Sequence, residues 1–162
     1  MADSSFDIVS SVDLQEVKNA IAQAMKEIQT RFDLKGTGSS VDLQGEEILL
    51  TSSDEFKLKA VRDVLEGRLV KRSVPLKALS FGTSEQALGG TVRQRVTLQK
   101  GIPTEKAREI VKLVKGEKFK AQVAIQGEEV RVSSSKIDIL QEIIAFLKSK
   151  DLGIHMQFTN FR

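Results

Sequence analysis

The stretch Val41-Asp-Leu-Gln-Gly-Glu-Glu-Ile48 returns in closely similar form as Val123-Ala-Ile-Gln-Gly-Glu-Glu-Val130. Three apolar positions downstream match at the same spacing and without a gap: Leu58 with Leu140, Val61 with Ile143, and Leu65 with Leu147. A match of this length in one register indicates a duplicated supersecondary unit. We therefore expect two modules, the first over residues 1–88 and the second over residues 89–162.

Both copies show the same order of local signals. A Gln-Gly pair separates two short alternating runs, which predicts a β-hairpin whose glycine takes a positive φ. Apolar residues at helical spacing follow each hairpin and also precede it, which predicts two amphipathic helices in each copy. The remaining strands are expected at Phe6–Ser10, Leu76–Phe81, Thr91–Gln99 and Ile154–Phe161, and the linker between the modules at Gly82–Gly90.

Each half therefore has the element order β-α-β-β-α-β. This order predicts an α+β protein of two tandem ferredoxin-like (βαββαβ) modules, each an antiparallel four-stranded sheet with two helices on one face. The other face of such a sheet is left uncovered. It is open to a ligand, to a partner or to the second module, and many RNA-binding modules bind through it.

Composition excludes several classes of function. The 162 residues include no cysteine and one histidine, His155, so disulfides and thiolate sites are excluded, and we expect no metal and no cofactor. The sequence has no G-x-G-x-x-G, Walker A or G-x-S-x-G motif. It therefore predicts a protein that is not an enzyme, in which His155 contacts a ligand rather than acting as a base.

The sequence also predicts a cytoplasmic protein without a membrane partner. The start, MADSSFDIVS, has neither the basic nor the apolar region of an export signal. No apolar run approaches the roughly 18–20 residues that span a bilayer.

The charge is unevenly distributed. The chain carries a net +3, divided as −3 over residues 1–90 (11 Lys and Arg against 14 Asp and Glu) and +6 over residues 91–162 (14 against 8). This asymmetry is typical of a protein whose second half meets a polyanion, although ordinary surface scatter gives the same numbers.

Basic residues of the second copy fall on predicted strands. If Val96 faces the helices, Arg93 and Arg95 face away from them, and the same alternation turns Lys120 and Arg131 outward. Outward arginines and lysines form a platform that attracts phosphates. The alternative is a solvated sheet edge, where lysine discourages aggregation.

Aromatic groups for base stacking are few. The chain has no Trp and no Tyr, and Phe161 is the best candidate for an exposed ring, since it stands beside two polar residues. An arginine plane can stack on guanine instead. The candidate nucleotide or nucleic-acid contacts are Arg31, Arg93, Arg95, Lys100, Lys112, Lys115, Lys120, Arg131, His155, Phe161 and Arg162.

Several motifs together resemble one known family. They are Ser5-Phe-Asp-Ile-Val-Ser-Ser-Val-Asp13, Thr30-Arg-Phe-Asp33, Lys100-Gly-Ile102, the run QVAIQGEEVRV at 122–132, and the closing Gln157-Phe-Thr-Asn-Phe-Arg162. From end to end the chain resembles the YajQ family of bacterial nucleotide-binding proteins. The resemblance implies tandem ferredoxin-like domains with exchanged N-terminal strands, binding of nucleotides or nucleic acid, and no enzymatic activity. It also implies cyclic di-GMP as a candidate ligand, since some relatives are described as its effectors.

Three functions stay open at this point. The first is a nucleotide-binding regulator that grips the phosphates of a guanine nucleotide or cyclic di-GMP. The second is an RNA-binding protein of low sequence specificity, whose binding would weaken steeply with salt. The third is an adaptor whose uncovered sheet faces bind a protein partner, which would require an exposed apolar patch.

Overall fold

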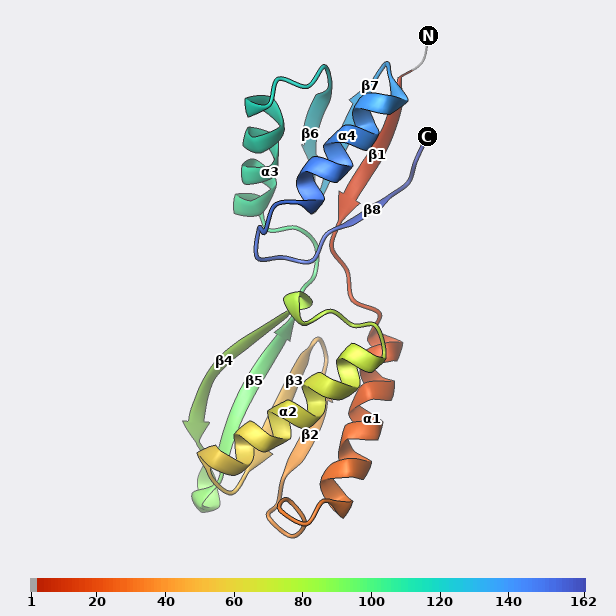
Figure 1. Cartoon of the computed structure of the whole chain (residues 1–162). Coiled ribbons are helices and arrows are strands. Elements are labelled where there is room, and N and C mark those ends of the chain that lie inside the picture. Colours follow the sequence, from red (N-terminus) through yellow and green to blue (C-terminus); the bar gives the residue numbers. More distant parts are fainter. Residues whose placement is uncertain (1–2) are drawn as a thin grey trace. The chain divides into compact units, whose positions relative to one another are not determined.

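The computed structural model describes residues 3–162, which form four-stranded sheets and α-helices in the predicted order (Figure 1). The first copy contains β1 (Ser4–Val9), α1 (Leu14–Thr30), β2 (Ser40–Gln44), β3 (Glu47–Ser52), α2 (Glu55–Lys71) and β4 (Leu79–Gln86). The second contains β5 (Val92–Leu98), α3 (Thr104–Gly116), β6 (Gln122–Gln126), β7 (Glu129–Ser134), α4 (Ile137–Lys148) and β8 (Gln157–Thr159). Short 3-10 helices at Leu76–Ala78 and Leu88–Gly90 flank β4.

The strand order shows that the two copies exchange their first strands. One sheet has the order β6-β7-β1-β8 and the other β2-β3-β5-β4, and every pairing is antiparallel. Strand β1 thus lies between strands of the second copy, and β5 between strands of the first. The α+β class, the ferredoxin-like plan and the exchange implied by the resemblance are confirmed.

The exchange changes where the compact units divide. One unit contains the described residues up to Ser11 together with Lys100–Arg162, and we call it the β1 unit. The other contains Val12–Gln99, and we call it the β5 unit. The ranges 1–88 and 89–162 follow the sequence repeat and do not coincide with these units, because each copy gives its first strand to the other sheet.

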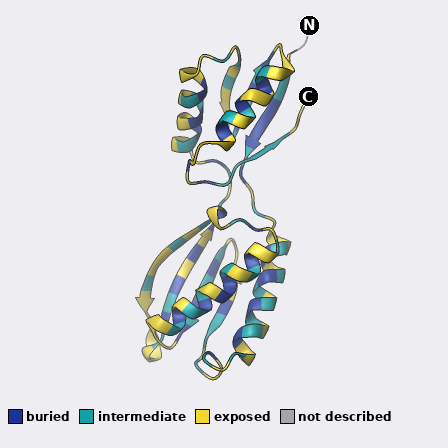
Figure 2. Ribbon diagram, in the orientation of Figure 1, coloured by how far each residue is buried: buried dark blue, intermediate teal, exposed yellow. Residues whose placement is uncertain are grey.

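Each unit has its own core between its helices and one sheet face. In the β5 unit, Val17, Ala24 and Ile28 of α1 lie buried with Ile48 and Val96 of the strands. In both units the buried residues lie on the sides of helices and strands that face each other (Figure 2). The apolar spacing seen in the sequence therefore becomes the helix-to-sheet interface.

The β1 unit repeats this arrangement with strands from both ends of the chain. Phe6 and Ile8 of β1 are completely buried against Ile110 of α3 and Ile143 of α4. Phe158 of β8 packs on the same cluster, and its ring meets that of Phe6 edge-on with centroids 5.9 Å apart. The chain termini therefore help to build this core.

The prediction that Gly82–Gly90 is a linker is wrong over most of this range. Strand β4 continues to Gln86, with a shift in register between Phe81 and Ser84 that accommodates Gly82. The Gln94 amide donates to the Gly82 carbonyl at 2.6 Å and holds this irregularity in place. A glycine-rich composition therefore marked a bulged hairpin strand rather than a connection between modules.

None of the helices within residues 3–162 combines the length and apolar character needed to cross a membrane.

Candidate functional site

The uncovered face of the β1 unit's sheet carries a cluster of polar and charged side chains. Because side chains alternate along a strand, Asp7 points away from the face on which Phe6 and Ile8 are buried. Asp7 pairs with Arg131 of β7 on one side and with Thr159 of β8 on the other. The predicted outward direction of Arg131 is thus correct, and it lies beside an acid of the central strand.

Asp7 holds this cluster together. Arg131 donates from Nε to Oδ1 of Asp7 at 2.8 Å and from Nη2 to Oδ2 at 3.4 Å, and Asn160 donates from Nδ2 to Oδ2 at 2.9 Å. The Arg162 guanidinium lies 3.8 Å from Oδ2. These neighbours leave the Asp7 side chain only 2% exposed. The hydrogen bond from Arg131 lowers the pKa of Asp7, helped by Asn160 and opposed by burial.

The C-terminal segment brings further predicted residues to this cluster. The backbones of Ser5 and Arg162 exchange two hydrogen bonds, of 3.1 and 3.0 Å, so the pairing with β1 continues beyond β8. Asn160 takes a positive φ of 54°, which bends the segment between the two pairings. The Phe161 ring lies 5.9 Å from that of Phe6 and is 63% exposed. Phe161 is thus exposed as predicted, but it is not the most exposed ring, since Phe32 and Phe56 are 98% and 80% exposed.

Arg93 and Arg95 face the uncovered side of the other sheet. They point away from the core as predicted, but each lies near a carboxylate, Arg93 at 3.8 Å from Glu85 and Arg95 at 3.7 Å from Glu47. The exchange of strands places them in a different sheet from Arg131. The predicted basic platform is therefore divided between two separate sheets, and its β5 portion is partly neutralised.

Other predicted contacts lie on helices or next to the ends of strands. Lys112 and Lys115 are exposed on α3, which covers the opposite side of the β1 unit's sheet. Lys120 is exposed just before β6, and Lys100 is exposed just after β5. Arg31 caps the end of α1 and forms a 2.7 Å ion pair with Asp33.

His155 lies between α4 and β8 and is partly buried. Burial lowers the pKa of this imidazole below its ordinary value of 6.5. The side chain is therefore neutral at pH 7 and can accept or donate one hydrogen bond without adding charge to a site.

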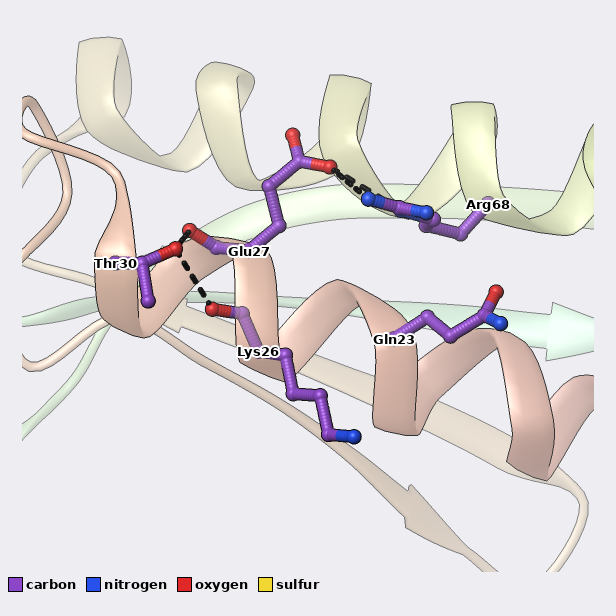
Figure 3. Close-up of a pocket in the computed structure, with 5 residues that line it drawn as sticks. All are labelled: Gln23, Lys26, Glu27, Thr30 and Arg68. Carbon is purple, nitrogen blue, oxygen red and sulfur yellow. Dashed lines mark hydrogen bonds and ion pairs between the residues drawn. The ribbon is translucent and has the colours of Figure 1, made fainter.

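A hollow of 470 Å³ lies between the two helices of the β5 unit and is lined by Gln23, Lys26, Glu27, Thr30 and Arg68 (Figure 3). The Arg68 guanidinium bridges from α2 to the Glu27 carboxylate of α1 at 2.8 Å. The Thr30 hydroxyl donates to the backbone carbonyls of Lys26 and Glu27, as the dashed lines in Figure 3 show. No pattern in the sequence predicted this hollow, because its lining residues have the composition of ordinary solvated helix positions.

Within residues 3–162 no group of three or more His, Asp or Glu side chains is placed to hold a metal ion.

Comparison with known proteins agrees with the resemblance. Residues 4–162 match the family described as nucleotide-binding protein YajQ-like. The chain belongs to the YajQ-like family. A nucleotide-binding protein of Koribacter versatilis is 65% identical over 162 residues, which cover 100% of this chain and 99% of the relative.

Two further relatives show the same full-length similarity. A protein of Solibacter usitatus is 54% identical over 164 residues, covering 100% of this chain and 99% of its own. One from Desulfitobacterium hafniense is 55% identical over 160 residues, covering 99% and 98%. Both are named nucleotide-binding proteins, and neither is named as an enzyme.

Proposed function

We propose that this YajQ-like protein is a cytoplasmic, non-enzymatic receptor for an anionic guanine nucleotide, with cyclic di-GMP as the first ligand to test. The nucleotide binds on the uncovered face of the β1 unit's sheet. The observation that carries this proposal is the pair Arg131 and Arg162, gathered on this face by one buried carboxylate, Asp7.

The geometry suits a phosphate. Asp7 engages Nε and Nη2 of Arg131, and this orients the guanidinium while Nη1 takes no part in these two bonds. Arg162 has 53% of its side chain exposed. Arg131 interacts with Glu129 as well as with Asp7, so the more exposed Arg162 is the main cation offered to a ligand. Guanidinium groups bind phosphate oxygens in a bidentate manner.

The same groups suit guanine. An arginine fork matches the O6 and N7 acceptors of guanine, which gives a preference over adenine. Because the Phe161 ring packs on Phe6 at the helix-covered side of the sheet, an arginine plane is the surface that remains for stacking on the base. The ligand expected from this arrangement is a guanine nucleotide with at least one phosphate close to the base.

The test is a fluorescence-anisotropy titration of the full chain with labelled cyclic di-GMP, with unlabelled cyclic di-GMP, GTP, ATP and a short RNA as competitors. We expect saturable binding, displacement by the guanine nucleotides, and about tenfold weaker binding for Arg162→Ala, which corresponds to about 1.4 kcal/mol. Arg95→Ala removes an arginine from the other sheet and is the matched control. Equal effects of the two substitutions would contradict the proposed site.

RNA is a second candidate, favoured by a separate observation. Lys112, Lys115, Lys118 and Lys120 are all exposed on or just after α3, and no ion pair engages them among residues 3–162. Displacement of the labelled nucleotide by RNA, with a steep loss of affinity as salt rises, would favour this function. Binding of neither ligand would leave the adaptor with a protein partner as the better hypothesis.

A further inference from the structure

The groove between α1 and α2 of the β5 unit has features that the proposed nucleotide site does not use. Beside the hollow of 470 Å³ lies a second hollow of 240 Å³, lined by Glu27, Arg31, Asp63, Val64, Gly67, Arg68 and Lys71. Glu27 and Arg68 line both hollows. We call the residues lining the two hollows the α1–α2 groove.

Positive charge predominates in the α1–α2 groove. Four cations line it, Lys26, Arg31, Arg68 and Lys71, against the two carboxylates of Glu27 and Asp63. No ion pair engages Lys26 or Lys71 among residues 3–162. Asp33, which pairs with Arg31 at 2.7 Å, reduces the net charge around the groove to about +1, and this charge favours an anion.

Glu27 positions two guanidinium groups within this groove. Its Oε1 accepts from Nε of Arg68 at 3.1 Å and from Nη2 of Arg68 at 2.8 Å. Its Oε2 lies 3.9 Å from Nη1 of Arg31. Because both Arg68 bonds go to one oxygen, the Nη1 group of Arg68 is left to bind a ligand, and the guanidinium is already oriented.

The fold does not explain why residue 67 is a glycine. It lies inside α2, where glycine is less favourable than alanine, and its φ is not in the positive range that would require glycine. A Cβ built at this position meets no atom within 4 Å, so no neighbour in the chain requires its absence. Gly67 lines the groove, and its missing side chain leaves the backbone of α2 open to a bound molecule.

We propose that the α1–α2 groove is a second binding site, for the phosphate groups of a small molecule. Arg68 and Arg31 hold the phosphate oxygens, Lys26 and Lys71 add charge from either helix, and Gly67 allows close approach. The larger hollow, of 470 Å³, is within the range of small-ligand sites, and the hollow of 240 Å³ that Gly67, Arg31 and Lys71 line adjoins it through Glu27 and Arg68. This size suits a phosphorylated small molecule better than an extended polymer. This site lies in a different unit from the proposed nucleotide site.

The test uses inorganic pyrophosphate as the probe and NMR of the full chain as the readout. We expect saturable shifts at the backbone amides of Thr30, Gly67 and Arg68. Gly67→Ala should weaken pyrophosphate binding about tenfold or more, while it raises Tm by about 2–4 °C because alanine is the better helix former. A purely structural role for Gly67 would not couple a more stable fold to weaker binding.

Gly116→Ala is the matched control, because Gly116 ends α3 and a Cβ there also meets nothing within 4 Å. We expect it to leave the pyrophosphate shifts unchanged, as should Arg162→Ala, which alters only the β1 unit. The proposal is overturned if pyrophosphate produces no saturable shifts at these three amides. It is also overturned if Gly67→Ala stabilises the chain and binds pyrophosphate as tightly as the unchanged chain does.

Discussion

The Asp7 carboxylate accepts a 2.8 Å hydrogen bond from Nε of Arg131, although 124 positions separate the two residues along the chain. Asp7 lies in β1, the first strand of the first copy, and Arg131 lies in the hairpin of the second. The ion pair is therefore a consequence of strand exchange, since β1 and β7 are neighbours only in the exchanged arrangement. It joins the central strand of the β1 unit to the side chains that we propose as the nucleotide site.

Replacing Asp7 with Asn should destabilise the chain at neutral pH. Asp7→Asn keeps the shape but removes the charge that receives the bonds from Arg131 and Asn160. We expect the free energy of unfolding, measured with urea, to fall by about 1–2 kcal/mol. Ser5→Ala, on the same face of the same strand, should have a much smaller effect.

The same substitution should change the response to acid. Because the folded pKa of Asp7 lies below its ordinary value of 3.8, its stabilising contribution is complete above that pH. The contribution is lost as the pH falls through the folded pKa. The stability gap between the unchanged chain and Asp7→Asn should therefore be constant above about pH 5 and narrow toward about pH 2. If the difference in free energy of unfolding between the two chains stays constant down to about pH 2, ionisation of Asp7 is not its source.

Two substitutions of Asn160 separate the contribution of its side-chain hydrogen bond to stability from that of its left-handed backbone conformation. Asn160→Gly loses the hydrogen bond to Asp7 but keeps a residue suited to the φ of 54°. Asn160→Ala loses the bond and adds left-handed strain, so it should unfold more easily than Asn160→Gly by about 1 kcal/mol. Urea unfolding of the two variants measures the difference directly. Equal stabilities would mean that the segment around Asn160 relaxes when the bond is lost.

Local sequence signals predicted the elements of this fold but not their exchange. The hairpins and helices follow from apolar spacing and from the Gln-Gly turns, which act over a few residues. Strand β1 has the same alternation whichever sheet receives it, so spacing alone could not assign its partners, and only the family resemblance implied them. At Gly82 a local signal was present but was assigned to the wrong structure, because glycine-rich composition is the same in a bulged strand and in a linker.

The candidate site was predictable only in part, because local signals cover some of its residues and long-range contacts bring in the others. Alternation alone turned Arg131 outward, since that depends only on its own strand. Asp7 and Asn160 were missed because their hydrogen bond joins positions 153 residues apart. One signal was available, since an acid between Phe6 and Ile8 in a strand of apolar residues requires a partner. The groove residues Gly67 and Arg68 gave no such signal.

The exchange predicts which fragments fold. A fragment of residues 12–99 contains every strand of the sheet β2-β3-β5-β4 and both of its helices. We expect it to unfold cooperatively in urea and to give dispersed NMR spectra. A fragment of residues 1–88 lacks β5, which lies between β3 and β4, so it should not fold cooperatively alone. Cooperative folding of 1–88 as a monomer would show that the first copy can close its own sheet with β1.

His155 should make stability depend on pH in a window separate from that of Asp7. Burial lowers the folded pKa of its imidazole, whereas the unfolded chain titrates near 6.5. The unfolded state then binds more protons between these two values, so stability is complete above pH 6.5 and falls as the pH drops toward the folded pKa. His155→Gln should remove this decline, which is measured as the change in Tm between about pH 7.5 and about pH 5.5. Because His155 is the only histidine, the same slope in both chains would show that its burial does not govern stability in this window.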